Sequence, residues 1–127
     1  MRSLVVSSLC LAVLLAGWGA FHYVSAEKSD EYITEIREVM IPAVQAEDWE
    51  TAQKSFKEFG RDWHRYKKAA AYFFDTTALN EADYSISRAE EFMKAKDPSN
   101  SAGELAALRE QFKFLHRNES ISMGNIF

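Results

Sequence analysis

The fold is decided by residues 49–73, which read WETAQKSFKEFGRDWHRYKKAAAYF. Apolar and aromatic residues recur in this stretch at intervals of three and four, and that spacing places their side chains on one face of an α-helix. A face this regular needs partner helices to cover it, so we predict packed core in preference to an aromatic ligand box. The residues of this apolar face are Trp49, Ala52, Phe56, Phe59, Trp63, Tyr66, Ala70 and Phe73.

Helical spacing also precedes and follows this stretch. A helix is predicted over residues 29–46, and Pro42 should kink it or mark its end, because proline removes a backbone donor and clashes with the preceding turn. Asp48 suits the N-cap of the central helix. Residues 79–93 repeat the spacing of three and four and predict a third helix.

The C-terminal part predicts a fourth helix. Ser101 and Glu104 form a capping-box pattern that would open it. Residues 121–127 are too short for another helix, so we expect them to lie extended, with Ile126 and Phe127 covering apolar surface of the bundle. Four amphipathic segments with short connections favour antiparallel neighbours. The predicted fold class is therefore all-α, with a small four-helix bundle made of two helical hairpins.

An apolar run precedes these helices. Residues 4–24 contain no Asp, Glu, Lys or Arg, and as a helix they would extend about 31 Å, which matches the hydrocarbon thickness of a bilayer. We therefore predict a transmembrane anchor over residues 1–26 and a helical extracytoplasmic domain over residues 27–127. Arg2 precedes the run and acidic residues follow it, which places the N-terminus in the cytoplasm and the domain outside.

The alternative is a signal peptide that is removed, so that the domain is secreted. Val24 and Ala26 frame the small-residue pattern that a signal peptidase accepts, with cleavage after Ala26. The run is longer than the apolar region of a typical signal peptide, which favours a retained anchor. Its outer end also carries aromatic residues that suit the belt at a membrane interface, namely Trp18, Phe21 and Tyr23.

Two rows of residues are candidate interaction surfaces. Small residues recur every fourth position in the apolar run, which would allow a second transmembrane helix or a second copy of the chain to approach closely. This small-residue row consists of Ser8, Ala12, Ala16 and Ala20. Basic residues recur at helical spacing in the central helix, on the side away from the apolar face. This basic row consists of Lys54, Lys57, Arg61, Arg65 and Lys68.

The basic row has two interpretations. Glu31, Glu35 and Glu38 form a comparable acidic row in the preceding helix, so the bases are expected either to pair with neighbouring helices or to be simply solvated. The second interpretation is a surface that faces anionic lipid head groups or acidic wall polymers.

Catalytic patterns are missing from the predicted outer domain. It contains no cysteine, and neither His64 nor His116 has a glutamate three positions earlier, as a carboxylate-bridged di-iron bundle requires. We therefore predict no metal, no cofactor and no enzyme activity. With 19 acidic and 15 basic side chains, the net charge of −4 argues against nucleic acid as a partner.

The expected role is a structural or protein-interaction subunit of a membrane or envelope component. Its partners would then be the membrane itself, another membrane protein, or a second copy of the chain. The alternative is a secreted small ligand-binding protein or enzyme whose site is assembled from residues that are scattered in the sequence.

Besides the N-terminal run, four short features of the chain form a recognisable pattern, which are Asp48-Trp49, Ala52 with Trp63, Ser85-Ile86-Ser87-Arg88, and Asn125-Ile126-Phe127. With these features the chain as a whole resembles the bacterial domain-of-unknown-function family numbered 4363, which comprises short, N-terminally anchored helical proteins. The resemblance implies an anchored, extracytoplasmic, helical protein, and it implies no particular activity.

Overall fold

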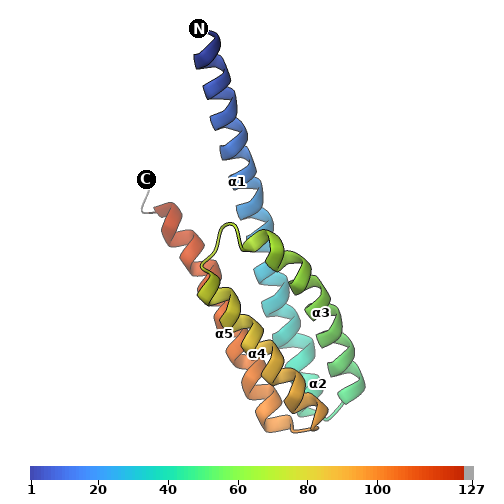
Figure 1. The fold of residues 1–127 in the computed structure, drawn as a ribbon. Helices are drawn as coiled ribbons and strands as arrows, with labels where there is room; N and C mark the ends of the chain where they lie inside the picture. Colours follow the sequence, from blue (N-terminus) through green and yellow to red (C-terminus); the bar gives the residue numbers. More distant parts are fainter. Residues whose placement is uncertain (125–127) are drawn as a thin grey trace.

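The computed structural model describes the backbone of residues 1–124 and the side chains of residues 1–117. Every regular element in this part of the chain is a helix, as the sequence predicts. In chain order these are α1 (Arg2–Glu35), the π-helical segment η1 (Ile36–Met40), α2 (Ile41–Gln45), α3 (Trp49–Ala70), α4 (Thr76–Lys94) and α5 (Pro98–Gly124) (Figure 1).

The apolar run and the first bundle helix form one continuous helix, α1. Residues 2–20 are exposed and project from one end of the bundle, whereas later turns of α1 contact α3 and α5 (Figure 1). The prediction that a separate helix begins near Ser29 is therefore wrong. No proline or glycine lies between Phe21 and Ser29, so nothing there ends a helix that has already formed.

Pro42 lies within this long helical rod. A proline ring clashes with the carbonyl group four residues earlier, which belongs to Glu38, and proline offers that carbonyl no N–H. Glu38 lies in η1, where the N–H of Ile41 bonds to the carbonyl oxygen of Ile36, five residues earlier. The wider π-helical turn accommodates the ring, so the rod changes its helix type at the proline and continues as α2.

Two turns are built alike at the end of the bundle remote from residues 2–20 (Figure 1). Glu47 and Lys96 follow α2 and α4 and have positive φ angles of 57° and 53°. The N–H groups of these turns return to carbonyl oxygens in the last turn of the preceding helix, which is a Schellman arrangement. Asp48 and Asp97 then accept hydrogen bonds of 3.3 and 3.1 Å from first-turn N–H groups of α3 and α5, so the predicted cap at Asp48 is confirmed.

α5 begins earlier than the sequence pattern predicted. Pro98 occupies its first position, where a missing N–H costs nothing, and Asp97 provides the cap. Ser101 consequently lies inside the helix and is fully buried, and Glu104 accepts a hydrogen bond from Arg88 of α4 at 3.1 Å. The predicted capping box is therefore wrong.

The C-terminal end of α5 also differs from the prediction. The helix continues through Gly124, so the extended conformation expected for residues 121–127 is wrong for residues 121–124. No proline and no earlier glycine interrupts this segment after Gly103, so nothing ends the helix before Gly124. Ile126 and Phe127 lie outside the described residues.

The core is centred on aromatic side chains from three helices. Tyr32 of α1, Phe59 and Trp63 of α3, and Phe112 of α5 are each at most 5% exposed. Their ring centroids lie 5.1–6.2 Å apart in edge-on and tilted pairs, the geometry that aromatic rings prefer. The predicted apolar face of residues 49–73 contributes five buried residues to this core, which are Ala52, Phe56, Phe59, Trp63 and Ala70.

Candidate functional site

The basic row lies along the exposed side of α3, as the helical spacing requires. All five side chains are exposed, and none of them forms an ion pair within 4.0 Å with any residue that the structure describes. Their positive charges are therefore not neutralised by direct contact within residues 1–117. The row keeps its capacity to attract an anion.

The acidic row does not pair with the basic row. Glu31 and Glu38 pair with bases of their own helical rod at 3.6 and 3.2 Å. Glu35 accepts a hydrogen bond from Ser55 at 2.7 Å. Pairing between these two rows, one of the two expectations for the bases, is therefore wrong within the described residues. The basic row instead borders a groove that α3 forms with α4, which we call the basic groove.

This groove has a volume of about 800 Å³ and combines two kinds of surface. Phe56 and Ile86 contribute apolar area, and four members of the basic row contribute charge. Glu90 of α4 is the one acid in the lining. Such a groove suits an anion with an apolar part. Its lining consists of Phe56, Lys57, Gly60, Arg61, His64, Arg65, Lys68, Ile86 and Glu90.

A different side of α3 is joined to α1 through Asp62. One oxygen of its carboxylate, Oδ2, accepts hydrogen bonds from Lys28 Nζ at 2.8 Å and from Tyr32 Oη at 2.7 Å. Partial burial alone would raise the pKa of Asp62, but these hydrogen bonds outweigh it and hold the pKa below its usual value. The hydrogen bond to Asp62 raises the pKa of Lys28, and burial raises the pKa of Tyr32. All three pKa values are shifted further from pH 7, which is typical of a structural link rather than an acid–base catalyst.

Asp83 makes the corresponding link between α4 and α3. Its Oδ1 accepts the indole N–H of Trp63 at 2.8 Å, and its Oδ2 pairs with Lys67. The buried indole thereby has a hydrogen-bond partner inside the bundle. Sequence reasoning missed both aspartates because neither falls on an apolar face. The available signal is that Asp62 precedes Trp63 and Asp83 follows the buried Ala82, so both acids lie at the edge of a buried face.

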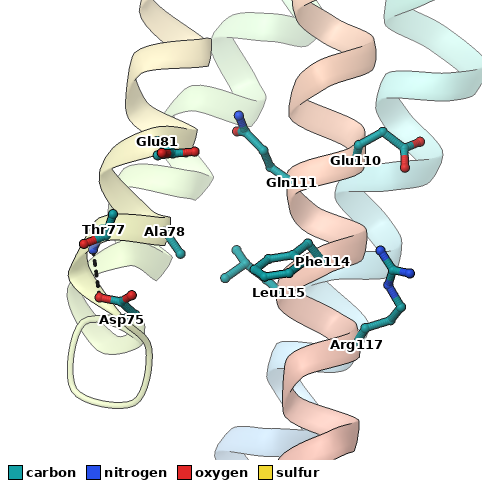
Figure 2. Close-up of a pocket in the computed structure, with 9 residues that line it drawn as sticks. All are labelled: Asp75, Thr77, Ala78, Glu81, Glu110, Gln111, Phe114, Leu115 and Arg117. Carbon is teal, nitrogen blue, oxygen red and sulfur yellow. Dashed lines mark hydrogen bonds between the residues drawn. The ribbon is translucent and has the colours of Figure 1, made fainter.

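A second groove, of about 490 Å³, lies between α4 and α5. Figure 2 shows Gln111 reaching from α5 toward α4, with Phe114 and Leu115 further along α5. Gln111 Nε2 donates to Ser85 Oγ at 2.8 Å, while Gln111 Oε1 is buried and accepts no hydrogen bond from the described residues. The groove therefore combines apolar area with a lining residue, Gln111, that holds one unpaired acceptor in the interior. Its size is in the range of small-molecule sites. Its full lining is Asp75, Thr77, Ala78, Glu81, Glu110, Gln111, Phe114, Leu115 and Arg117.

The small-residue row lies on the projecting part of α1, where every side chain is exposed and no other part of the described chain reaches it. This helix has the length and composition of a membrane span, and a signal sequence near the N-terminus would meet the same criteria. The structure keeps the two candidate surfaces apart: the small-residue row is on the projecting helix, and the basic row is on the bundle (Figure 1).

Metal-ligating side chains do not gather in the part of the chain that the structure describes, where no group of three or more His, Cys, Asp or Glu residues is placed to hold an ion. The candidate surfaces described so far are the two grooves and the projecting apolar helix. The described part of the chain is thus all-helical, and its helical bundle is continuous with a long apolar N-terminal helix.

The chain belongs to the family described as "Domain of unknown function (DUF4363)", whose model matches residues 20–126. The resemblance drawn from the sequence is thereby confirmed. No curated protein and no solved structure matches the chain. The matched region begins at the end of the apolar run, before the candidate cleavage position at Ala26, and extends over the whole bundle.

Proposed function

We propose that this protein is a single-pass membrane protein. Residues 4–24 of α1 span the bilayer with the N-terminus in the cytoplasm, and the bundle, a four-helix bundle of two antiparallel hairpins, lies on the outer side. The observation that carries the proposal is the continuity of α1. One helix supplies both an exposed apolar segment, residues 4–20, that no other part of the described chain covers, and buried residues of the bundle. Lipid is the environment in which such an exposed apolar segment is stable.

Retention of the segment is supported by its contacts with the bundle. Ser25 is fully buried, and its hydroxyl lies 2.5 Å from Tyr66 Oη. The ring of Phe21 stacks on Phe73 with centroids 3.9 Å apart. Cleavage after Ala26 would remove both contacts from the folded domain. The start of the family match at residue 20 supports the same conclusion.

The bundle acts as a structural or protein-interaction subunit of a membrane or envelope component. The contacts of Asp62 support this role, because its hydrogen bonds from Lys28 and Tyr32 join α3 to α1. The small-residue row offers a face to another membrane helix or to a second copy of the chain.

The membrane arm of the test uses the full chain expressed with a C-terminal tag. We expect the protein to stay in the membrane fraction after washes with high salt and with carbonate, and its N-terminal sequence to begin at Met1 or Arg2. Recovery of a soluble chain that begins at Glu27 would contradict the anchor and favour secretion.

The partner arm captures the tagged chain from detergent-solubilised membranes. Replacing Ala12 and Ala16 with leucine enlarges the small-residue row, and we expect a co-purifying membrane component to be lost. The matched control replaces Leu11 and Leu14, on the opposite side of α1, with phenylalanine and should retain that component. An identical set of bound proteins for both variants would contradict a role for the row.

A second candidate function, a secreted ligand-binding protein, is favoured by the groove between α4 and α5. Its volume of about 490 Å³ and its mixed apolar and polar lining suit a small molecule. The N-terminal sequence from the membrane arm separates the two proposals, because secretion requires a mature chain that begins at Glu27.

A further inference from the structure

The turn between α3 and α4 carries an aromatic cluster at the end of the bundle from which α1 projects (Figure 1). Tyr72, Phe73 and Phe74 follow one another in this turn. Tyr72 is 87% exposed and Phe73 is 49% exposed, while Phe74 is partly buried. A single exposed aromatic residue is ordinary, but neighbouring ones beside an exposed apolar helix form a continuous apolar surface.

The contacts of Phe21 show at which position along α1 this turn lies. Its ring stacks on Phe73 with centroids 3.9 Å apart and lies 6.0 Å from the ring of Phe74. Phe21 belongs to the apolar run and precedes its last residue, Val24, by about 4.5 Å along the helix axis. A bilayer that covers α1 as far as Val24 therefore reaches the ring of Phe73 as well.

The backbone N–H groups of the aromatic cluster are all hydrogen-bonded. The N–H groups of Tyr72, Phe73 and Phe74 donate to the carbonyl oxygens of Ala69 and Ala70 at 2.9–3.2 Å. Polar backbone groups that lack partners would oppose insertion into the interface, because each costs free energy when it loses water. The three donors of the aromatic cluster avoid that cost.

The opposite end of the bundle has a different composition. Its two turns contain the charged residues Glu47, Asp48, Lys96 and Asp97 and no aromatic residue. Aromatic rings are enriched where a protein meets the head-group region, and charged turns favour bulk water. The α3–α4 turn also ends in an exposed charge, Asp75, which caps α4. The two ends therefore differ in the aromatic residues of their turns, and that is the difference a nearby bilayer would require.

We infer that the α3–α4 turn is a second membrane contact of the bundle. Tyr72 and Phe73 insert into the head-group region of the bilayer that α1 crosses, and the exposed Lys68, one turn earlier, faces lipid phosphates. The inference rests on the proposed transmembrane role of α1. It gives the bundle two points of attachment and so fixes its tilt relative to the membrane.

The test measures depth in the bilayer with a nitroxide label on the full chain in phosphatidylcholine–phosphatidylglycerol vesicles. One label is attached to the native Cys10. Two others are attached to the variants Tyr72→Cys and Ala95→Cys, each combined with Cys10→Ser. Collisions with oxygen report lipid, and collisions with a water-soluble nickel chelate report water. Tyr72 and Ala95 are both exposed, so either substitution should leave the fold intact, and Ala95 is the matched control at the opposite end.

We expect the chelate to be excluded from the label at Cys10 and to collide freely with the label at Ala95. The label at Tyr72 should show several-fold fewer collisions with the chelate than the label at Ala95, together with more collisions with oxygen. Equal chelate collisions at Tyr72 and Ala95, with Cys10 still shielded, would overturn the membrane contact and leave the anchor intact. Shielding of the Tyr72 label from both reagents would also overturn it, in favour of a protein partner. Chelate access to Cys10 would overturn the anchor itself.

Discussion

The two sides of α3 show how this bundle separates packing from charge. The inner side places Phe59 and Trp63 in the aromatic core, each at most 5% exposed. The outer side carries the basic row, whose five charges have no ion-pair partner among the described residues. The polar contacts that join the helices are made by Asp62 and Asp83, at partly buried positions between the buried and the exposed side. Partial shielding strengthens a charged hydrogen bond, whereas full exposure weakens it.

The largest effect is expected from breaking the inner side. Trp63→Ala removes a buried ring and the hydrogen bond from its indole N–H to Asp83, so we expect a loss of about 3–5 kcal/mol in the free energy of unfolding. Urea unfolding of the full chain in detergent micelles, followed by circular dichroism, measures this loss. Lys57→Ala, on the outer side of the same helix, is the control and should change stability by less than about 0.5 kcal/mol. Similar midpoints for the two variants would show that the aromatic face is not the core.

An intermediate effect is expected at the edge between the two sides. Asp62→Asn keeps the shape but removes the charge that Lys28 and Tyr32 contact, and we expect a loss of about 1 kcal/mol at pH 7, because the carboxylate is partly screened by water. Glu58→Gln, an exposed neutralisation in the same helix, is the control and should have little effect.

The pH dependence of this effect has a definite sign. The pKa of Asp62 is lower in the folded protein than in the unfolded chain, so its contribution is complete above the ordinary aspartate pKa of about 3.9 and is lost as the pH falls through the folded value. The pKa of Lys28 is raised, so its share persists at neutral pH and is lost only above about pH 10.4. The difference between wild type and Asp62→Asn should therefore shrink below about pH 4. A difference that is constant from pH 7 to pH 3 would contradict the charged link.

The smallest effect on stability is expected on the outer side. Reversing Lys57, Arg61 and Arg65 to glutamate should change the free energy of unfolding by at most a few tenths of a kcal/mol per site, because none of them forms an ion pair with a described residue. Titration of the full chain in neutral nanodiscs with soluble polyphosphate tests the second interpretation of the row. We expect weak binding or none. Strong binding that falls between low and physiological salt and disappears on reversal would instead identify the basic groove as a ligand site.

The sequence predicts the helical fold well because the side chains that decide it are regularly spaced. The apolar face of α3 and the cap at Asp48 depend on residues close together in the chain, and both are found where the pattern places them. The helix ends were harder to predict. Ser101 with Glu104 matches a capping box, yet Asp97 with Pro98 provides a better start, with the cap four residues earlier. Local patterns that compete for the same helix end cannot be ranked by spacing alone.

The candidate sites were predicted less completely, because they depend on contacts between distant residues. Spacing along α3 correctly places the basic row on an exposed side, but only the packing of α4 creates the groove beside it. The contact between Phe21 and Phe73 joins residues far apart in the sequence, and no periodicity links them. The sequence indicates an aromatic belt at the end of the apolar run, and the fold adds a turn from another part of the chain to the same level.

The unbroken helix α1 also fixes a rotational relation between its two halves. Consecutive residues of an α-helix are separated by 100° around the axis, and α1 has no break between Ser8 and Tyr32. Projected along the axis, the small-residue row lies about 150° from the side marked by the buried residues Ser25, Ser29 and Tyr32. A second helix packed on that row would therefore contact α1 on the side facing away from the bundle. The position of that second helix around α1 would therefore determine in which direction, within the plane of the membrane, the groove between α3 and α4 faces.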